Sequence, residues 1–163
     1  MNYSNWKIEE CPTDKLKMFT DAGYPALLAA LLSVRGLGSV QEAKSFLDGG
    51  AELLCDPLLM KDMDRAAARI RRALSMRETV AVYGDYDVDG ITSTCLLTDW
   101  LRSRGLECYP YIPDRIGEGY GLNSAAIDTL HGKGVSLIIS VDCGITAAEE
   151  AKHAKEVGVD LII

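Results

Sequence analysis

The chain has 163 residues, of which 48% are hydrophobic and 25% charged, as in an ordinary globular protein with one domain-sized core. Its apolar runs are too short for a membrane helix and its polar, acidic N-terminus does not resemble a signal peptide, so we expect a cytoplasmic protein without membrane contact. A net charge of −7 argues against a broad basic surface for nucleic acid, although an acidic metal cluster would leave a nuclease possible.

The cysteines are odd in number, scattered, and never in a C-x-x-C spacing. This pattern predicts reduced thiols rather than a disulfide framework or a zinc site. Cys143 directly follows an apolar run, and for it we favour a packing role over that of a nucleophile. The five positions are Cys11, Cys55, Cys95, Cys108 and Cys143.

Residues 1–78 predict only helices and loops, and we treat them as a helical N-terminal region. An alanine- and leucine-rich helix covers Pro25 to Val34. Ser39 caps a second helix, with Glu42 three residues later completing a capping box. A third helix, for which Asp62 can serve as the N-cap, runs to about Met76.

From residue 79 the pattern changes to alternating strands and helices. Such alternation predicts βαβ units, a parallel sheet and an α/β fold, with ligands gathering at the carboxyl ends of the strands. The predicted strands are Thr79–Tyr83, Glu107–Ile112, Leu137–Val141 and Val159–Ile163, and the predicted helices are Ile91–Arg104, Ser124–His131 and Ala147–Val157.

Acidic residues follow two of the predicted strands. Asp85, Asp87 and Asp89 come after the first strand and crowd three negative charges into five residues, where repulsion favours a bound cation. Carboxylates are ligands suited to Mg, Ca or Mn. Asp142 follows the third strand, either as a helix cap or as a further ligand. Because parallel strands end at one edge of the sheet, we favour a single metal centre built from both strand ends.

Other acidic and glycine-rich motifs fit this segment less well. The three aspartates and Gly90 match an EF-hand loop, but Leu96 stands where that loop needs a bidentate glutamate. A haloacid-dehalogenase-like phosphatase also places D-x-D after its first strand, yet Asp89 occupies its Thr or Val position when Asp85 leads. The G-x-G-x-G of residues 117–121 follows the second strand, so it is weak as a dinucleotide fingerprint, and no P-loop is present.

Three ordered motifs carry a resemblance to the DHH phosphoesterase superfamily. Residues 83–90 resemble its first motif, residues 113–115 with 119–122 its second, and residues 141–144 its third. Within the superfamily the chain is most similar to RecJ-type single-stranded-DNA-specific exonucleases, and the resemblance extends through the helical region. Tyr83 departs from the pattern, because many members have a histidine at that place.

The resemblance implies a 5′-to-3′ exonuclease of DNA recombination and repair that uses two divalent ions, Mn or Mg. Its partners would be single-stranded DNA and, for the full-length protein, repair or single-strand-binding proteins. The family's Asp-His-His motif would begin just past Ile163. We therefore expect an N-terminal fragment that ends within the DHH domain, residues 79–163, and is inactive by itself.

The expected site residues fall into two groups. Asp87, Asp89 and Asp142 are the predicted catalytic metal ligands, with Asp85 as a further ligand or a support for them. Arg115 suits a bidentate phosphate contact, with a surface salt bridge as the alternative. The loop of Gly119, Tyr120 and Gly121 is the other predicted substrate-binding element, in which Tyr120 either stacks on a base or packs.

Two other functions stay open at this point. One is a DHH phosphodiesterase for short oligonucleotides or cyclic dinucleotides, which the 78 residues before Thr79 disfavour. The other is a non-catalytic DHH scaffold, which should have lost acidic residues that this chain keeps.

Overall fold

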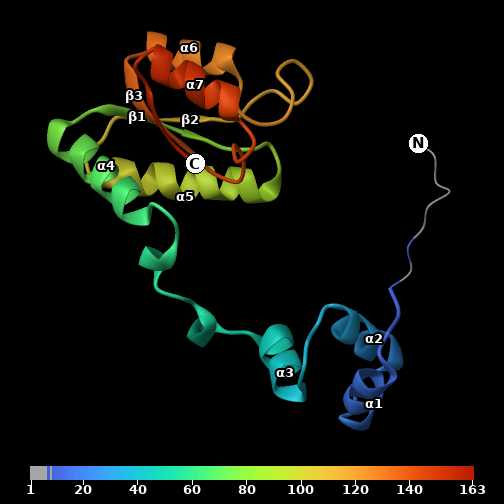
Figure 1. Cartoon of the computed structure of the whole chain (residues 1–163). Helices are drawn as coiled ribbons and strands as arrows, with labels where there is room; N and C mark the ends of the chain where they lie inside the picture. The colour runs from blue at the N-terminus through green and yellow to red at the C-terminus, as the bar shows by residue number, and fades with distance from the viewer. Residues whose placement is uncertain (1–6, 8) are drawn as a thin grey trace. The chain divides into compact units, whose positions relative to one another are not determined.

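The computed structural model describes residue 7 and residues 9–163 (Figure 1). The chain forms two compact units that divide between Asp56 and Pro57. The sequence division at residue 78 placed the helix α4 (Met63–Met76) in the helical N-terminal region, whereas this helix belongs to the second unit of the structure. Among the described residues, no helix has both the length and the apolar character needed to cross a membrane.

The first unit is helical around a small core. Its second and third helices confirm the sequence prediction, while the first was not predicted, since it begins after Pro12 without a side-chain cap. The Ser39 side chain accepts a hydrogen bond from the Glu42 N–H at 3.1 Å, which confirms the predicted cap. The Glu42 carboxylate accepts from the Gly38 N–H and not from Ser39, so the predicted capping box is displaced by one residue. The elements are α1 (Thr13–Asp21), α2 (Ala26–Val34), α3 (Val40–Asp48) and the 3-10 turn η1 (Ala51–Leu53), and their buried core is Phe19, Ala29, Leu32 and Ala43.

The second unit contains a four-stranded sheet in which every pairing is parallel, in the order β2-β1-β3-β4. This confirms the predicted α/β fold, and all seven predicted elements after residue 78 are present. The strands are β1 (Thr79–Tyr83), β2 (Cys108–Tyr111), β3 (Val135–Ser140) and β4 (Asp160–Ile162), and the helices between them are α5 (Val88–Ser103), α6 (Ser124–Gly132) and α7 (Ala148–Glu156), with the 3-10 turn η2 (Pro57–Leu59) ahead of α4.

Helices cover both faces of the sheet, and the alternation of side chains along β1 divides the core between them. Ala81 and Tyr83 face the core shared with α6 and α7. Val80 and Val82 face the opposite core, which includes Ala73 of α4 and Leu101 of α5. Figure 1 shows α6 and α7 on one side of the strands and α4 and α5 on the other. Buried on both faces, β1 is apolar from Val80 to Val82, as central parallel strands are.

The strand order reverses at β1. From β1 the chain passes through α5 to β2 on one side, and then returns through α6 to β3 on the other side. The ends of β1 and β3 lie next to each other, with Tyr83 paired to Ser140. Open α/β sheets bind ligands at such a reversal, in the crevice beyond the carboxyl ends of the two strands.

The start of α5 and the cap of α4 differ from the sequence prediction. Helix α5 begins at Val88 rather than Ile91, because Asp87 is an N-cap whose side chain accepts from the Gly90 N–H at 3.0 Å. Asp62 does not cap α4 with its side chain. Its backbone is left-handed, with φ of 58°, and its carboxylate pairs with Arg65 instead.

An ion-pair cluster lies at the other edge of the sheet, where the strands begin. Arg69 of α4 pairs with Glu78 at 2.6 Å and with Asp160, at the start of β4, at 2.5 Å. Ser136 donates a hydrogen bond to Glu78 at 2.6 Å. The Ser136 hydrogen bond and the Arg69 ion pair lower the pKa of Glu78 against the opposing effect of burial. The cluster therefore attaches α4 to three strands of the sheet.

We predict that Arg69→Ala lowers the free energy of unfolding by about 1–3 kcal/mol, because it removes the nearer cation of the Glu78 carboxylate and leaves Arg72, whose Nε lies 3.9 Å away. The matched control is Arg65→Ala on the same helix, whose exposed pair with Asp62 should change stability by no more than about 0.5 kcal/mol. Urea denaturation at pH 7 measures both. Since the pKa of Glu78 is lowered by folding, the contribution of Arg69 should be present above the ordinary glutamate pKa and should disappear as the pH falls through the folded value. Equal losses in the two variants would contradict the assignment.

Candidate metal centre

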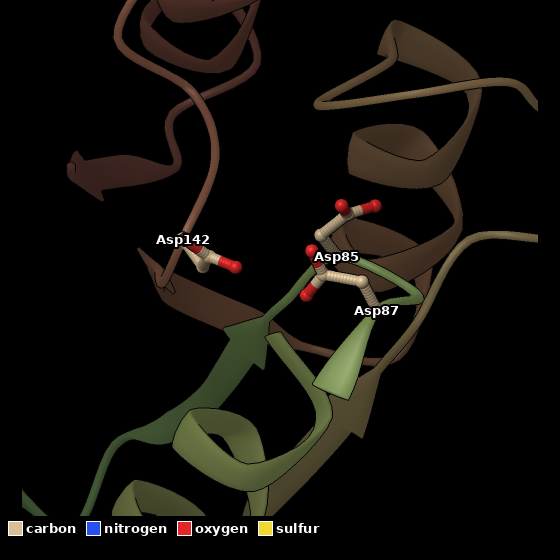
Figure 2. Close-up of side chains that lie close together, drawn as sticks. All are labelled: Asp85, Asp87 and Asp142. Atoms are coloured by element: carbon tan, nitrogen blue, oxygen red, sulfur yellow. The ribbon is translucent and has the colours of Figure 1, made fainter. Parts of the chain in front are cut away.

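Three of the four predicted acidic ligands meet beyond the ends of β1 and β3. Asp85, Asp87 and Asp142 each offer a carboxylate oxygen, and these oxygens all lie within 4.8 Å of one another. Figure 2 shows Asp85 and Asp87 on the segment after β1 and Asp142 approaching from the segment after β3. Asp85 is buried, at 4% exposure, while Asp87 and Asp142 are open to solvent. A buried carboxylate with two accessible ones beside it is a suitable donor set for a hard divalent cation.

Two glycines fix the path of the chain between β1 and α5. A Cβ on Gly90 would overlap the backbone of Asp85, so the first turn of α5 packs directly on that residue. A Cβ on Gly84 would overlap the hydroxyl of Thr94, one turn further along the helix. The motif therefore needs glycine at both positions for reasons of space, and this close packing determines where the Asp85 carboxylate lies.

Asp142 has a left-handed backbone, with φ of 59°. Aspartate tolerates this conformation better than most residues, but it still raises the energy of the backbone, as is common at functional sites. A hydrogen bond stabilises the loop that contains Asp142: the Ser140 hydroxyl donates to the Cys143 carbonyl at 3.0 Å. Asp142 is therefore not a cap of α7, which has no side-chain cap hydrogen bond. Of the two predicted roles for this residue, that of a helix cap is wrong, and that of a ligand stays a prediction.

The electrostatics of the cluster favour a cation. Partial loss of hydration, followed by the negative charges of Asp87, Asp89 and Asp85, raises the pKa of Asp142. The N-terminus of α5 offsets part of this repulsion, because Asp87 and Asp89 stand at its positive end. Roughly half a unit of helix-dipole charge does not balance three carboxylates, whereas a bound divalent ion would neutralise most of their charge.

Asp89 lies apart from the three converging carboxylates. It belongs to the exposed first turn of α5, and among the described residues it does not join the group of acidic oxygens within 4.8 Å. Its charge nevertheless contributes to the raised pKa of Asp142, so it lies in the same electrostatic field. Its role as a metal ligand stays a prediction.

The predicted substrate loop after β2 lies beside the acids. The Arg115 guanidinium carbon is 5.0 Å from the centre of the Tyr86 ring. Tyr120 meets the same ring edge-on, and its hydroxyl is 3.5 Å from the Asp142 carbonyl oxygen. Gly119 and Gly121 have left-handed backbones, with φ of 82° and 86°, which let the loop turn back toward the cluster. The loop residues that sequence reasoning selected thus adjoin the metal centre.

Hydrogen bonds to two acidic residues of this loop stabilise its shape. Asp114 accepts hydrogen bonds from the backbone N–H groups of Ile116 and Gly117, at 3.0 and 2.6 Å. Glu118 accepts from the Asp114 N–H and from the Tyr111 hydroxyl. The Tyr111 hydrogen bond is the main cause that lowers the pKa of Glu118. Arg115 therefore extends from a closed loop whose shape its neighbours maintain.

Tyr83 and Cys143 serve the fold. The Tyr83 hydroxyl donates to the Gly121 carbonyl at 2.8 Å and accepts from the Asn123 amide at 3.2 Å, inside the core shared with α6. Both hydrogen bonds tie its hydroxyl to the loop between β2 and α6. Burial raises the pKa of the Cys143 thiol to about 11, so the thiol stays protonated near neutral pH and is a poor nucleophile. Its packing against the same core fits the structural role we favoured.

Sequence reasoning overlooked Tyr86. The available signal was an aromatic residue placed between two acids, Asp85 and Asp87, in a loop where small polar residues would serve a turn equally well. Its contacts with both Arg115 and Tyr120 could not be read from the sequence, because they depend on how the loop after β2 folds back.

We predict that Gly90→Ala disrupts the metal centre, since the new methyl group would displace the Asp85 backbone. Overpacking of this kind should lower the free energy of unfolding by about 1–3 kcal/mol and weaken Mn²⁺ binding. Gly132→Ala, near the end of α6, is the matched control, because its Cβ would meet no atom within 4 Å. Urea denaturation and metal titration of both variants test this. Unchanged Mn²⁺ binding by a folded Gly90→Ala variant would contradict it.

We also predict that Asp142→Asn weakens Mn²⁺ binding at least about tenfold. Asparagine accepts the left-handed backbone, so the loss would reflect the missing charge rather than a misfolded loop. The charge-matched control is Asp99→Asn, an exposed residue further along α5, which should bind as the unaltered protein does. Isothermal titration calorimetry measures the affinities. Equal affinity of the two variants would remove Asp142 from the ligand set.

Comparison with known proteins identifies the family of this chain. A family model described as "DHH family, N-terminal domain" matches residues 79–163. The single-stranded-DNA-specific exonuclease RecJ of Bacillus subtilis is 43% identical over 159 residues, which are 97% of this chain and 20% of that protein. RecJ of Escherichia coli is 32% identical over 143 residues, which are 87% of this chain and 24% of that protein. The chain thus spans about a fifth to a quarter of these curated relatives.

Solved structures agree with these matches. A crystal structure of exonuclease RecJ bound to manganese has a TM-score of 0.60 and 36% identity, covering 66% of this chain and 28% of that chain. RecJ of Thermus thermophilus in complex with Mn²⁺ has a TM-score of 0.57 and 28% identity, covering 92% of this chain and 20% of that chain. With a family model that matches more than half of its residues, the chain belongs to the DHH family.

Proposed function

We propose that this chain is the metal-binding part of a RecJ-type exonuclease that hydrolyses phosphodiester bonds of single-stranded DNA. The enzyme would work in the 5′-to-3′ direction with two divalent ions, Mn²⁺ or Mg²⁺. Its place would be in DNA recombination and repair in the cytoplasm, alongside repair or single-strand-binding proteins. The parts of the relatives that lie beyond this chain's match would supply the remaining functions of the enzyme.

One observation carries the proposal: three carboxylates from two strand ends meet within 4.8 Å at the reversal of a parallel sheet. The donor set fits the proposed ions, since all its atoms are carboxylate oxygens and their mutual repulsion calls for positive charge. The relatives' Mn²⁺-bound structures support the same chemistry. Bound there, divalent ions supply Lewis-acid activation of water and neutralise charge on the phosphate.

Each group of residues then has a defined task. Asp85, Asp87 and Asp142 hold the ions, and Asp89 at the start of α5 adds negative charge to the site and is our fourth proposed ligand. Arg115 presents a planar fork of donors to a substrate phosphate. In the part of the chain that the structure describes, no carboxylate forms an ion pair with Arg115, which favours the phosphate role over the alternative of a surface salt bridge. Gly119, Tyr120 and Gly121 form the wall of the substrate site next to it.

The two other functions fit the observations less well. A phosphodiesterase for short oligonucleotides or cyclic dinucleotides has no use for the helical unit, yet the similarity to RecJ of B. subtilis extends over 97% of the chain. A non-catalytic scaffold would have no reason to keep three converging carboxylates and a left-handed aspartate, which raise the energy of the fold.

We predict that the complete gene product degrades single-stranded DNA only with a divalent metal, and that Asp87→Ala lowers kcat by at least about 100-fold. Because Asp87 also caps α5, Asp87→Asn is the second variant to test, since asparagine caps as well as aspartate but lacks the charge. Asp99→Asn is again the control for lost charge. Release of nucleotides from a labelled oligonucleotide with Mn²⁺ gives the rate. Near-normal turnover by folded Asp87→Asn would refute the proposed site.

A further inference from the structure

We propose that Tyr86 is a positioning residue, which holds the guanidinium of Arg115 beside the metal-binding aspartates so that it can bind a substrate phosphate. The inference rests on the proposed function and adds to it the residue that sets the location of the phosphate-binding group. Its basis is a chain of contacts that joins three loops: Arg115 to Tyr86, Tyr86 to Tyr120, and Tyr120 to the backbone of Asp142.

The position of Tyr86 relative to the acids is fixed by the backbone. It lies between Asp85 and Asp87, and its N–H donates to the Asp85 carboxylate at 2.7 Å. The chain on either side has little freedom, because Gly84 and Gly90 pack without space for a methyl group. The half-buried ring of Tyr86 is therefore a fixed platform beside the metal-binding residues.

Arg115 lies over this platform. Its guanidinium carbon is 5.0 Å from the ring centre, within the range of a cation–π contact. Among the described residues the guanidinium has no hydrogen-bond or ion-pair partner, so its contact with the Tyr86 ring is the interaction that places it. A cation–π contact does not use the N–H groups of the guanidinium for a carboxylate or a carbonyl, so these donors remain available.

Tyr120 supports the platform from another direction. Its ring meets that of Tyr86 at 78°, with the ring centres 6.3 Å apart, in an edge-to-face arrangement. Its hydroxyl lies 3.5 Å from the Asp142 carbonyl oxygen. Tyr86 thus contacts the loop after β2 through both Arg115 and Tyr120, and Tyr120 in turn reaches the loop after β3.

An aromatic partner has a chemical advantage over an acidic one for this arginine. A carboxylate would also fix the side chain, but it would occupy the donors that a phosphate needs and would add negative charge beside three aspartates. A tyrosine ring orients the guanidinium and leaves its positive charge unneutralised. Tyr86 should accordingly act through its ring, and its hydroxyl should be dispensable.

The test uses the complete gene product and four variants: Tyr86→Phe, Tyr86→Leu, Arg115→Ala, and the double variant with leucine and alanine. Steady-state hydrolysis of a single-stranded oligonucleotide with Mn²⁺ gives kcat and KM. Calorimetry gives the Mn²⁺ affinity, and fluorescence anisotropy with Ca²⁺ in place of Mn²⁺ gives oligonucleotide affinity under conditions chosen to limit turnover.

We expect Tyr86→Leu to weaken oligonucleotide affinity roughly 3- to 30-fold, as loss of a cation–π contact would. Tyr86→Phe should bind the oligonucleotide nearly as tightly as the unaltered protein does. The Mn²⁺ affinity of Tyr86→Leu and of Tyr86→Phe should change by less than about twofold. In the Arg115→Ala background, Tyr86→Leu should have little further effect, because the group that it positions is gone.

Two results would overturn the inference. One is an equal loss from Tyr86→Leu with and without Arg115, which would show that the tyrosine acts on its own. The other is a loss of Mn²⁺ affinity that accounts for the whole effect. Absence of metal-dependent hydrolysis in the unaltered protein would instead refute the proposed function, and the anisotropy measurements would still decide whether Tyr86 positions Arg115.

Discussion

The parallel pairing of β1 with β3 is the contact on which the metal centre depends. Tyr83 and Ser140 are partners at the ends of these strands, and the residues that follow them leave the sheet side by side. Asp85 and Asp142, separated by 57 positions in the chain, consequently face one another. A shift in this pairing by one residue would turn Ala81 and Tyr83 out of their core and would also separate the acids. The same contact thus determines both the packing of the core and the geometry of the site.

Close packing of backbone on backbone then sets the finer geometry. The first turn of α5 lies against Asp85, and this is possible only because position 90 has no side chain. Asp87 ends the loop by capping the same helix, so its carboxylate both starts α5 and faces the cluster. Residues 84–90 therefore form the turn, the helix start and two potential ligands. A substitution in this motif would affect both the fold and the metal centre.

Much of this arrangement could be predicted from the sequence. The alternating pattern after residue 78 predicted the parallel sheet. The rule that ligands gather at the carboxyl ends of parallel strands predicted that Asp142 would lie near the acids that follow β1. The start of α5 was placed three residues late, because a capping aspartate and a ligating aspartate look alike in sequence. Helix α1 was missed for lack of a side-chain cap. The cation–π contact of Arg115 with Tyr86 could not be predicted, since it depends on a loop that hydrogen bonds of Asp114 and Glu118 hold together.

The ion-pair cluster around Arg69 lies where the strands begin, and the metal centre lies where they end. At the Arg69 edge the charged side chains form ion pairs, whereas at the metal centre the carboxylates face one another without an ion-pair partner among the described side chains. Because a β-strand rises about 3.3 Å per residue, the five residues of β1 alone separate the two edges by roughly 15 Å, which is beyond the range of appreciable screened interaction. Substitutions that strengthen the Arg69 edge should therefore raise the melting temperature of the protein without altering its affinity for metal. This edge is a suitable place to stabilise variants of the metal centre that would otherwise be too unstable to purify.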